Sequence, residues 1–311
     1  MNDGGKCKMS NFNNQEYQIL VKNLIGDAFY SETSYRGKIS TIRQYAEVVV
    51  RKLLDIDPNK QITLGQKDIQ SQLQSLPNFK YLKSSIDTIR NKGNSATHTQ
   101  NIGEVSENDF EDIVDNLFNI LAFPLINYFD MYDFGSNAAI MHSFSLLPPI
   151  IRYKVLKFLF EKYPDNIAVI DKLVLATMKA FSNDEAVEWI EQRKDILNKM
   201  QTVTEKAITG IVDKYGEEIA MLIQSNAPDS MYHLCKDKIL QVGGRIDKEG
   251  VLYSDFESAL PHYRLNGVIE GNTSEIKQFN DIMEFLYLGR KEQLKSLPKD
   301  SSSYIIMNFI S

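Results

Sequence analysis

The chain has 311 residues, of which 43% are hydrophobic and 24% charged, and its formal net charge at pH 7 is −6. This length suggests about two domains, and the composition is that of a globular protein with a sizeable core rather than of a disordered chain. The acidic balance excludes a protein coated in basic surface, such as a histone-like binder, but it leaves room for a local basic cleft.

Three features of the sequence indicate the cellular compartment: few cysteines, a polar start and no long apolar stretch. Its two cysteines, Cys7 and Cys235, lie far apart in the chain, which argues against a disulfide framework and for a reducing compartment. The polar start MNDGGKCKMSNFNNQE lacks the apolar region of a signal peptide. The stretch LFNILAFPLINYF at 117–129 is shorter than the roughly 18 apolar residues that a membrane helix needs. We therefore expect a soluble, cytoplasmic protein with no membrane partner.

The first part of the chain is predicted to be a helical domain over residues 13–130, after a disordered N-terminus at 1–12. Apolar side chains recur there at spacings of three and four, which is typical of helices that bury one face. The predicted helices cover about 15–30, 35–56, 64–76, 78–91 and 107–129. Ser106 suits the N-cap of the last one, because acidic residues fill the turn that follows.

After a linker at 131–137, a second, mainly helical domain is predicted over 138–311, so the expected fold class is all-α. Its predicted helices lie near 149–162, 166–181, 183–200, 203–225, 228–241 and 273–296. Glycines flanking short β-prone runs suggest a small β-hairpin near 243–255, or a loop. The apolar end YIIMNFI at 304–310 is expected to pack against its own chain or a partner.

The segment IRNKGNSATH at 89–98 carries the side chains that are the clearest candidates for catalysis. Metal-independent cleavage of RNA needs a general base, a general acid and positive charge near the phosphorus. Histidine suits proton transfer because its ordinary pKa lies near neutrality, so His98 is a candidate acid or base. Arg90 is a candidate phosphate ligand, because a guanidinium is always charged and binds phosphate through a planar fork.

Three segments together resemble the HEPN superfamily, in particular the group with an IRxxGNxAxH motif that also occurs near the N-terminus of type I restriction subunits. They are IRQYAEVVVRKLL (42–54), TLGQKDIQSQL (63–73) and IRNKGNSATH (89–98), and the resemblance covers roughly residues 30–130. It implies an all-helical domain that forms a homodimer, with Arg90 and His98 of both chains in one cleft. Asn91, Lys92 and Asn94 would then bind or orient the RNA phosphate or the imidazole.

The spacing within the motif departs from that of active HEPN ribonucleases. Seven residues separate Arg90 from His98, whereas four to six separate the corresponding pair in the active enzymes. One interpretation is that Gly93, which tolerates a positive φ, bulges the helix so that the two side chains still meet. The ordinary interpretation is that Gly93 ends the helix and Asn94 forms a turn.

Three further charged residues, Arg43, Glu47 and Arg51, follow one another at intervals of four on the second predicted helix. Such a ladder is usually a solvated or an interhelical ion pair. Its functional interpretation is a wall of the same cleft, in which Glu47 holds an arginine in place.

Other features give weaker signals. The histidines His142, His233 and His262 lie apart with no second ligand at helical spacing, so neither a metal nor another cofactor is expected. The run GGR at 243–245 could bind phosphate through its backbone amides, but glycine pairs are mostly turns, and it is interpreted as a turn. Trp189 is interpreted as a core residue. No nucleotide-binding or hydrolase motif is present in the sequence.

Two functional hypotheses follow. The first is a toxin-like, metal-independent endoribonuclease of a prokaryotic defence or toxin–antitoxin system, such as an abortive-infection effector, whose substrate is RNA. Its C-terminal domain would sense a trigger or bind an antitoxin or a larger defence complex. The alternative is a non-catalytic HEPN-like module that docks on a defence nuclease, a reverse transcriptase or another partner, because helical arrays commonly present binding surfaces.

Overall fold

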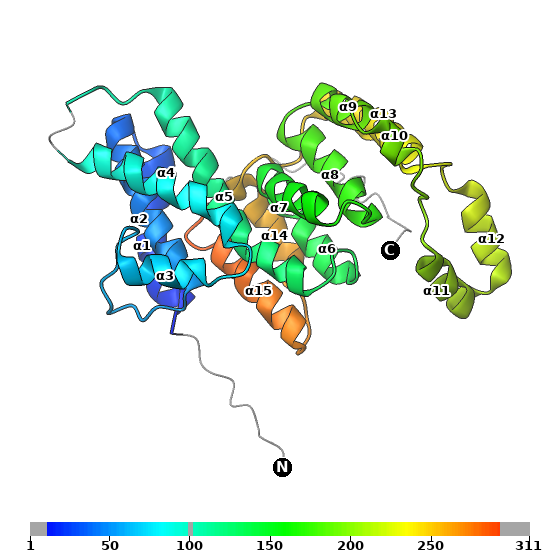
Figure 1. Ribbon diagram of the computed structural model, residues 1–311, viewed down its shortest axis with the longest axis horizontal. Helices are drawn as coiled ribbons and strands as arrows, with labels where there is room; N and C mark the ends of the chain where they lie inside the picture. The colour runs from blue at the N-terminus through cyan, green and yellow to red at the C-terminus, as the bar shows by residue number, and fades with distance from the viewer. Residues whose placement is uncertain (1–10, 99–101, 293–311) are drawn as a thin grey trace, which may run out of the picture. The chain divides into compact units, whose positions relative to one another are not determined.

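The computed structural model describes residues 11–98 and 102–292, and within these ranges it consists of helices and loops without a strand (Figure 1). The all-α prediction is thereby confirmed. In the same part of the chain, no helix is both long and apolar enough to cross a membrane.

The chain divides into two compact units, which are described separately below. The first contains the described residues up to Asn127 together with Gln278–Lys291, and the second contains Tyr128–Lys277. Two helices, α5 (Glu107–Met131) and α15 (Ser274–Leu286), therefore contribute residues to both units. The sequence-based boundaries at 130 and 138 remain predictions about domain organisation, and they did not anticipate that 278–291 joins the first unit.

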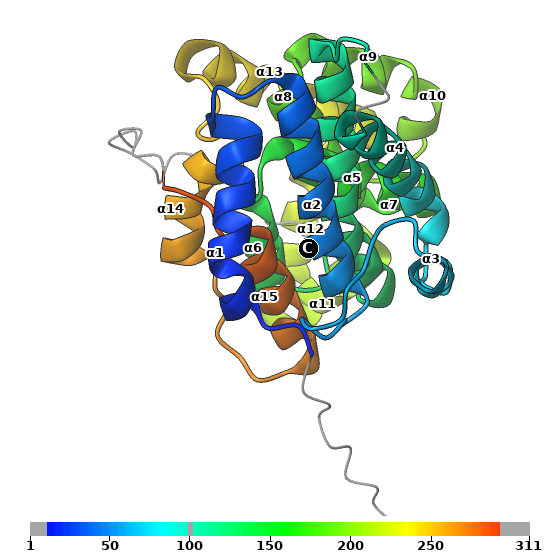
Figure 2. The same ribbon diagram turned by 90° about the vertical axis from the view of Figure 1, so that its left-hand side faces the viewer.

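The first unit is built around two long helices that pack against each other. Besides the parts of α5 and α15 just mentioned, it contains α1 (Asn14–Ile25), the π-helical turn η1 (Gly26–Tyr30), α2 (Tyr35–Leu53), α3 (Lys67–Gln74) and α4 (Phe79–Thr97). The helix α2 packs against α4 on one side and against α1, which runs beside it in Figure 2, on the other. Its predicted apolar stripe is buried at Ile39, Ile42, Ala46 and Val49, so this helix is central to the core.

Side-chain caps fix where several of these helices begin. The hydroxyl of Ser34 accepts a hydrogen bond from the Gly37 N–H at 3.3 Å at the start of α2. Ser106 does the same for Asp109 at 3.2 Å at the start of α5, which confirms the predicted N-cap. Such caps satisfy backbone N–H groups that have no partner within the helix.

The segment that ends the described chain completes the core of the first unit. Phe285 is 1% exposed, and its ring meets that of Phe12 edge to face at 5.6 Å between centroids. Phe12 also stacks on Tyr17 at 4.4 Å. The prediction of disorder is therefore wrong for Phe12, because its ring packs between those of Tyr17 and Phe285. Residues 1–10 lie outside the described residues.

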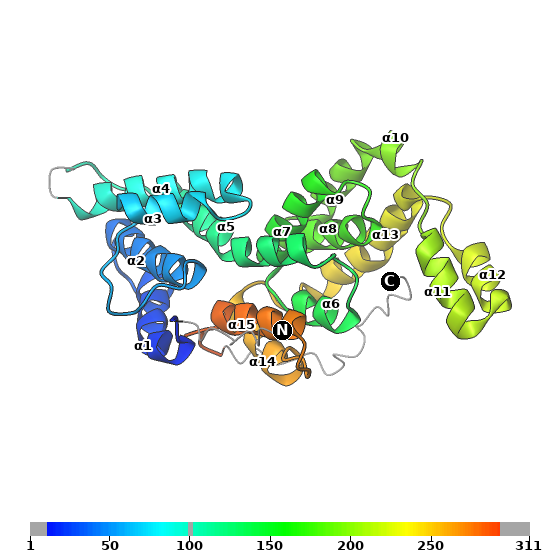
Figure 3. The same ribbon diagram turned by 60° about the horizontal axis from the view of Figure 1, so that its bottom comes forward.

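The second unit contains a layered helical core. Its helices are α6 (Ala138–Ser145), α7 (Pro149–Lys162), α8 (Ile167–Ala180), α9 (Asn183–Glu191), α10 (Lys194–Leu197), α11 (Glu205–Tyr215), α12 (Glu217–Asn226), α13 (Met231–Glu249) and α14 (Phe256–Asn266). Figure 3 shows α7, α8, α9 and α13 gathered together, and α8 packs against each of the other three. Trp189 packs against the hydrophobic cluster that these helices enclose.

The predicted β-hairpin near 243–255 is wrong, and so is the predicted turn at the two glycines. The helix α13 continues to Glu249 through Gly243 and Gly244. Gly243 packs closely against α9, because a Cβ there would lie 3.0 Å from the side chain of Asn183. A tertiary contact thus accompanies the first glycine of the pair, whereas a Cβ on Gly244 would meet nothing within 4 Å. The run at 304–310 lies outside the described residues.

Candidate functional site

The motif IRNKGNSATH lies on a continuous helix. The helix α4 runs to Thr97, and His98 forms its C-cap, donating its backbone N–H to the Asn94 carbonyl at 3.0 Å. Gly93 has no positive φ. Both sequence-based interpretations are therefore wrong: Gly93 neither bulges the helix nor ends it.

A close contact between helices accounts for the glycine. Gly93 is buried, and a Cβ at this position would lie 2.5 Å from Cδ and 2.9 Å from Cβ of Arg43 on α2. The missing side chain lets the stem of Arg43 lie directly on α4. The residue type at position 93 is thus set by the packing of α2 against α4 rather than by backbone conformation.

A regular helix places the polar residues of the motif on one side. With about 100° between successive residues, Arg90, Asn94 and His98 fall within an arc of about 80°, and Asn91 lies at the edge of the same arc. His98 and Asn91 are exposed, and Asn94 is half-buried. These four residues form what we call the α4 polar face. Along the helix axis, Arg90 and His98 are separated by about 12 Å.

The guanidinium of Arg90 is held by its neighbours on the helix. It forms an ion pair with Asp87 at 3.1 Å, and its Nε donates to Asn91 Oδ1 at 3.4 Å. Its stem passes close to Gly65, because a Cβ on that glycine would lie 3.4 Å from Arg90 Cδ. The side chain keeps 28% of its surface exposed, so the cation is oriented but still reachable from solvent. Asp87 was not singled out from the sequence, although its i−3 spacing from Arg90 was a usable signal.

The ladder on α2 meets α4 at Gly93, on which the stem of Arg43 lies. Glu47 is 3.7 Å from Arg43 Nε, while Arg51 donates to the Asp57 carbonyl at 3.2 Å. Burial raises the pKa of the Glu47 carboxyl, although Arg43, the backbone N–H of Leu64 and Arg51 all favour its ionised form. The ladder therefore supports the packing of α2 on α4 through Arg43 and Glu47, and Arg51 fixes the chain after α2.

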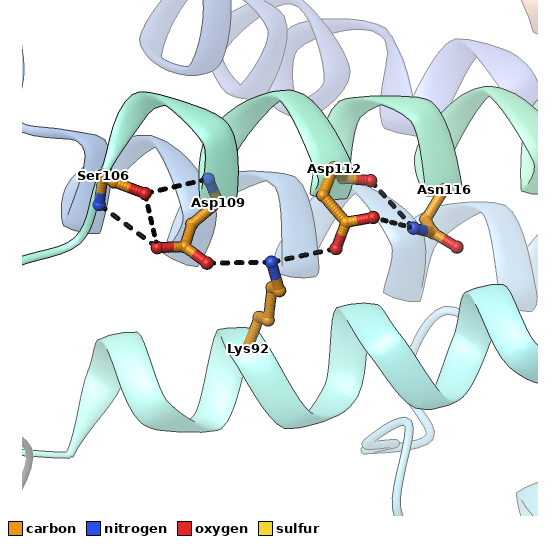
Figure 4. Close-up of polar contacts among 5 residues, drawn as sticks. All are labelled: Lys92, Ser106, Asp109, Asp112 and Asn116. Carbon is orange, nitrogen blue, oxygen red and sulfur yellow. Dashed lines mark hydrogen bonds and ion pairs between the residues drawn. The ribbon is translucent and has the colours of Figure 1, made fainter.

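Lys92 joins α4 to α5 (Figure 4). Its ammonium lies 2.9 Å from Asp109 and 2.9 Å from Asp112. Hydrogen bonds from Lys92 and from Ser106 lower the pKa of Asp109 to about 2. Burial alone would lower the pKa of Lys92, but the two carboxylates raise it. Because two acids already neutralise this cation, its structural role is an ion-paired link between helices.

A pocket of about 610 Å³ adjoins the α4 polar face. It is lined by Arg36, Asn91, Lys92, Ser95, Asp109 and residues 102–105, so Asn91 belongs to both features, whereas Arg90 and His98 do not line it. Arg36 donates to the carbonyls of Ala96 at 3.3 Å and Gly103 at 3.0 Å. It thereby caps the C-terminal end of α4, where backbone carbonyls lack helical partners. No sequence pattern singles out this arginine.

The histidines do not gather into a metal site. In the described ranges, no three side chains of His, Cys, Asp or Glu are arranged so that they could hold a metal ion. The α4 polar face offers one imidazole and one guanidinium, which are groups suited to proton transfer and to binding an anion.

No family model, no curated protein and no solved structure matches the chain. The likeness to the HEPN superfamily is therefore a resemblance between sequence motifs.

Proposed function

We propose that the protein is a metal-independent endoribonuclease whose site is the α4 polar face, completed by a second copy of the chain. One observation supports this proposal above the others: Arg90, Asn94 and His98 share one solvent-accessible side of a single helix. This is the combination of residue types that a metal-free phosphodiester cleavage requires, and it is open to a large substrate.

The need for a second copy follows from distance and stoichiometry. A general base and a general acid must each reach atoms of the same phosphodiester within about 3 Å. One chain supplies a single histidine on this face, and Arg90 lies about 12 Å along the helix from it. Two copies that pair through this face would supply two histidines and two arginines around one phosphate.

The roles of the four residues follow from their contacts. His98 would transfer protons, and Arg90, oriented by Asp87 at 3.1 Å, would stabilise the charge that develops on the phosphate. Asn94 and Asn91 would orient the substrate through their amides. Lys92 is excluded from the phosphate-binding set because Asp109 and Asp112 already engage its ammonium. The biological setting proposed from the motif is a prokaryotic defence or toxin–antitoxin system.

The alternative proposal, a non-catalytic interaction module, is favoured by a different observation. The helices α11 and α12 pack against each other and expose several large apolar side chains. These are Tyr215, Ile219, Met221 and Leu222, with exposed fractions of 58%, 41%, 59% and 57%. Exposed apolar surface of this kind often marks a contact with a partner protein.

The test of the nuclease proposal uses purified full-length protein and a mixed RNA substrate with EDTA present. We expect the wild type to cleave, and Arg90→Ala and His98→Ala each to reduce the rate by about 10²-fold or more. Lys80→Ala is the control, because Lys80 is an exposed residue on the same side of α4 but about 15 Å before Arg90 along the helix axis, too far for its ammonium to reach the phosphate that Arg90 would bind; it should cleave like the wild type.

Growth after tightly induced expression at equal protein levels provides the second measurement. Arrest by the wild type and by Lys80→Ala, but not by the Arg90 and His98 variants, would support the nuclease. Sedimentation should show a dimer at micromolar concentration. If both variants match the wild type in cleavage and in toxicity, the proposed site is wrong and the interaction module becomes the better explanation.

A further inference from the structure

The second unit contains a concentration of positive charge that the proposed nuclease does not use. It comprises Arg152 on α7, Lys172 and Lys179 on α8, and Lys238 on α13, with Asp171 as the acidic member; these five residues are called the basic cluster. The helices that carry it pack together, with α8 in the middle. Four cations thus accompany one carboxylate on these packed helices, and the side chains of Lys172, Lys238 and Asp171 keep 23%, 12% and 14% of their surface exposed.

Arg152 is the least satisfied member of the basic cluster. Only 7% of its surface is exposed, and its Nε is buried without a hydrogen-bond partner. Its guanidinium lies over the ring of Tyr253 at 5.9 Å from the centroid. An aromatic ring can hold a guanidinium plane in place, but it does not supply the hydrogen-bond acceptors that a buried arginine needs.

Two of the three lysines pair with Asp171, and the third does not. Asp171 pairs with Lys172 at 3.2 Å and also with Lys238. Lys179 lies seven residues after Lys172, so a regular helix places both on the same side of α8, about 10 Å apart along its axis. Among the described residues, no acidic side chain pairs with Lys179, and the charges that act on it are those of Arg152 and Lys172.

The concentration of like charges in the basic cluster is unfavourable for the folded protein. Burial, reinforced by the like charges of Arg152 and Lys172, lowers the pKa of Lys179 to about 7. Arg152 also lies near the N-terminal end of α7, where the helix dipole disfavours a cation. Buried charges without partners are costly, and groups kept in such a state are common at binding sites.

We propose that the basic cluster binds the diphosphate group of a small-molecule ligand, with Arg152 and Lys179 as its principal contacts. A diphosphate would supply acceptors to the guanidinium of Arg152 and would neutralise the surplus of cations. The cations are distributed along two turns of α8. A diphosphate, whose oxygens are spread over two phosphates, can contact more of them than a single phosphate can. The helical second unit would then respond to a phosphorylated metabolite or nucleotide.

The experiment measures the melting temperature of full-length protein in buffers of equal ionic strength with chloride, phosphate, pyrophosphate or ADP. We expect millimolar pyrophosphate to raise the melting temperature of the wild type by about 3 °C or more, because a ligand that binds only the folded state stabilises it. Phosphate should have a smaller effect. A larger shift with ADP than with pyrophosphate would identify a nucleotide as the source of the diphosphate.

Lys179→Met provides the decisive comparison. This variant should melt at a higher temperature than the wild type in chloride, because an unfavourable buried charge is gone, and titration calorimetry should show at least a tenfold loss of pyrophosphate affinity. Lys157→Met, which removes an exposed lysine from α7, should respond to pyrophosphate like the wild type. The proposal is overturned if neither pyrophosphate nor ADP stabilises the wild type beyond chloride, or if Lys179→Met binds pyrophosphate as tightly.

Discussion

At the scale of single residues, Gly93 affects the candidate site because its lack of a side chain lets α2 pack closely on α4. Its position under the stem of Arg43 brings α2 and α4 close together, and this contact fixes the helix on which Arg90 and His98 lie. The glycine therefore acts on the α4 polar face indirectly, through the packing behind it.

We predict that Gly93→Ala destabilises the protein by about 1–3 kcal/mol, because the new Cβ overlaps the inner atoms of Arg43, which are fixed by the backbone of α2. Urea unfolding followed by circular dichroism measures this change. Gly244→Ala is the control, since Gly244 lies within α13 and a Cβ there meets nothing within 4 Å. It should stabilise by about 0.5–1 kcal/mol. An unchanged or more stable Gly93→Ala protein would contradict the packing argument.

At the scale of elements, α4 and α5 are joined by charge as well as by apolar contact. Lys92 bridges to two acids of the first turns of α5, and Asp109 also bonds to the hydroxyl and backbone N–H of Ser106 (Figure 4). One carboxylate thus serves as an ion-pair partner and as part of a helix cap. Both roles need its ionised form.

We predict that the stabilisation provided by Asp109 is lost in acid. The pKa of Asp109 is about 2 in the folded protein and about 3.9 in an unfolded chain. A lowered folded-state pKa means that the contribution is complete above about pH 4 and disappears as the pH falls through 2. The melting temperature of Asp109→Asn should therefore lie below that of the wild type at pH 7 and approach it near pH 2. A constant difference over this range would exclude the predicted linkage.

At the scale of the whole molecule, the first unit is completed by residues from the far end of the described chain. Phe285 contacts Phe12, Asp281 pairs with Lys52 at 2.7 Å, and the guanidinium of Arg290 lies over the ring of Tyr45. The first unit therefore cannot reach its full core until the residues of the second unit have been synthesised.

We predict that Phe285→Ala destabilises the first unit by about 3–5 kcal/mol, because it removes a fully buried aromatic side chain. The single tryptophan, Trp189, lies in the second unit, so its fluorescence reports the unfolding of that unit. Circular dichroism should show an earlier transition in this variant, whereas the transition in Trp189 fluorescence should stay near that of the wild type. If both transitions shift equally, the two units unfold together.

The sequence by itself determined the helical nature of the chain, since hydrophobic periodicity and capping residues act locally. The burial of Ile39, Ile42, Ala46 and Val49 and the N-cap at Ser106 could be predicted for this reason. It also indicated Arg90 and His98 as residues worth testing, because their chemistry is intrinsic.

The tertiary structure alone decided the features that depend on contacts between distant residues. Gly93 and Gly243 look like helix breakers, yet both lie within helices, and each faces a side chain of a neighbouring helix. Contacts between distant residues also decide how α4 ends, where Arg36 caps it, and which acids pair with Lys92. The same holds for Arg152, whose buried Nε has no hydrogen-bond partner. Periodicity shows which face of a helix is buried, but it does not show what lies against that face.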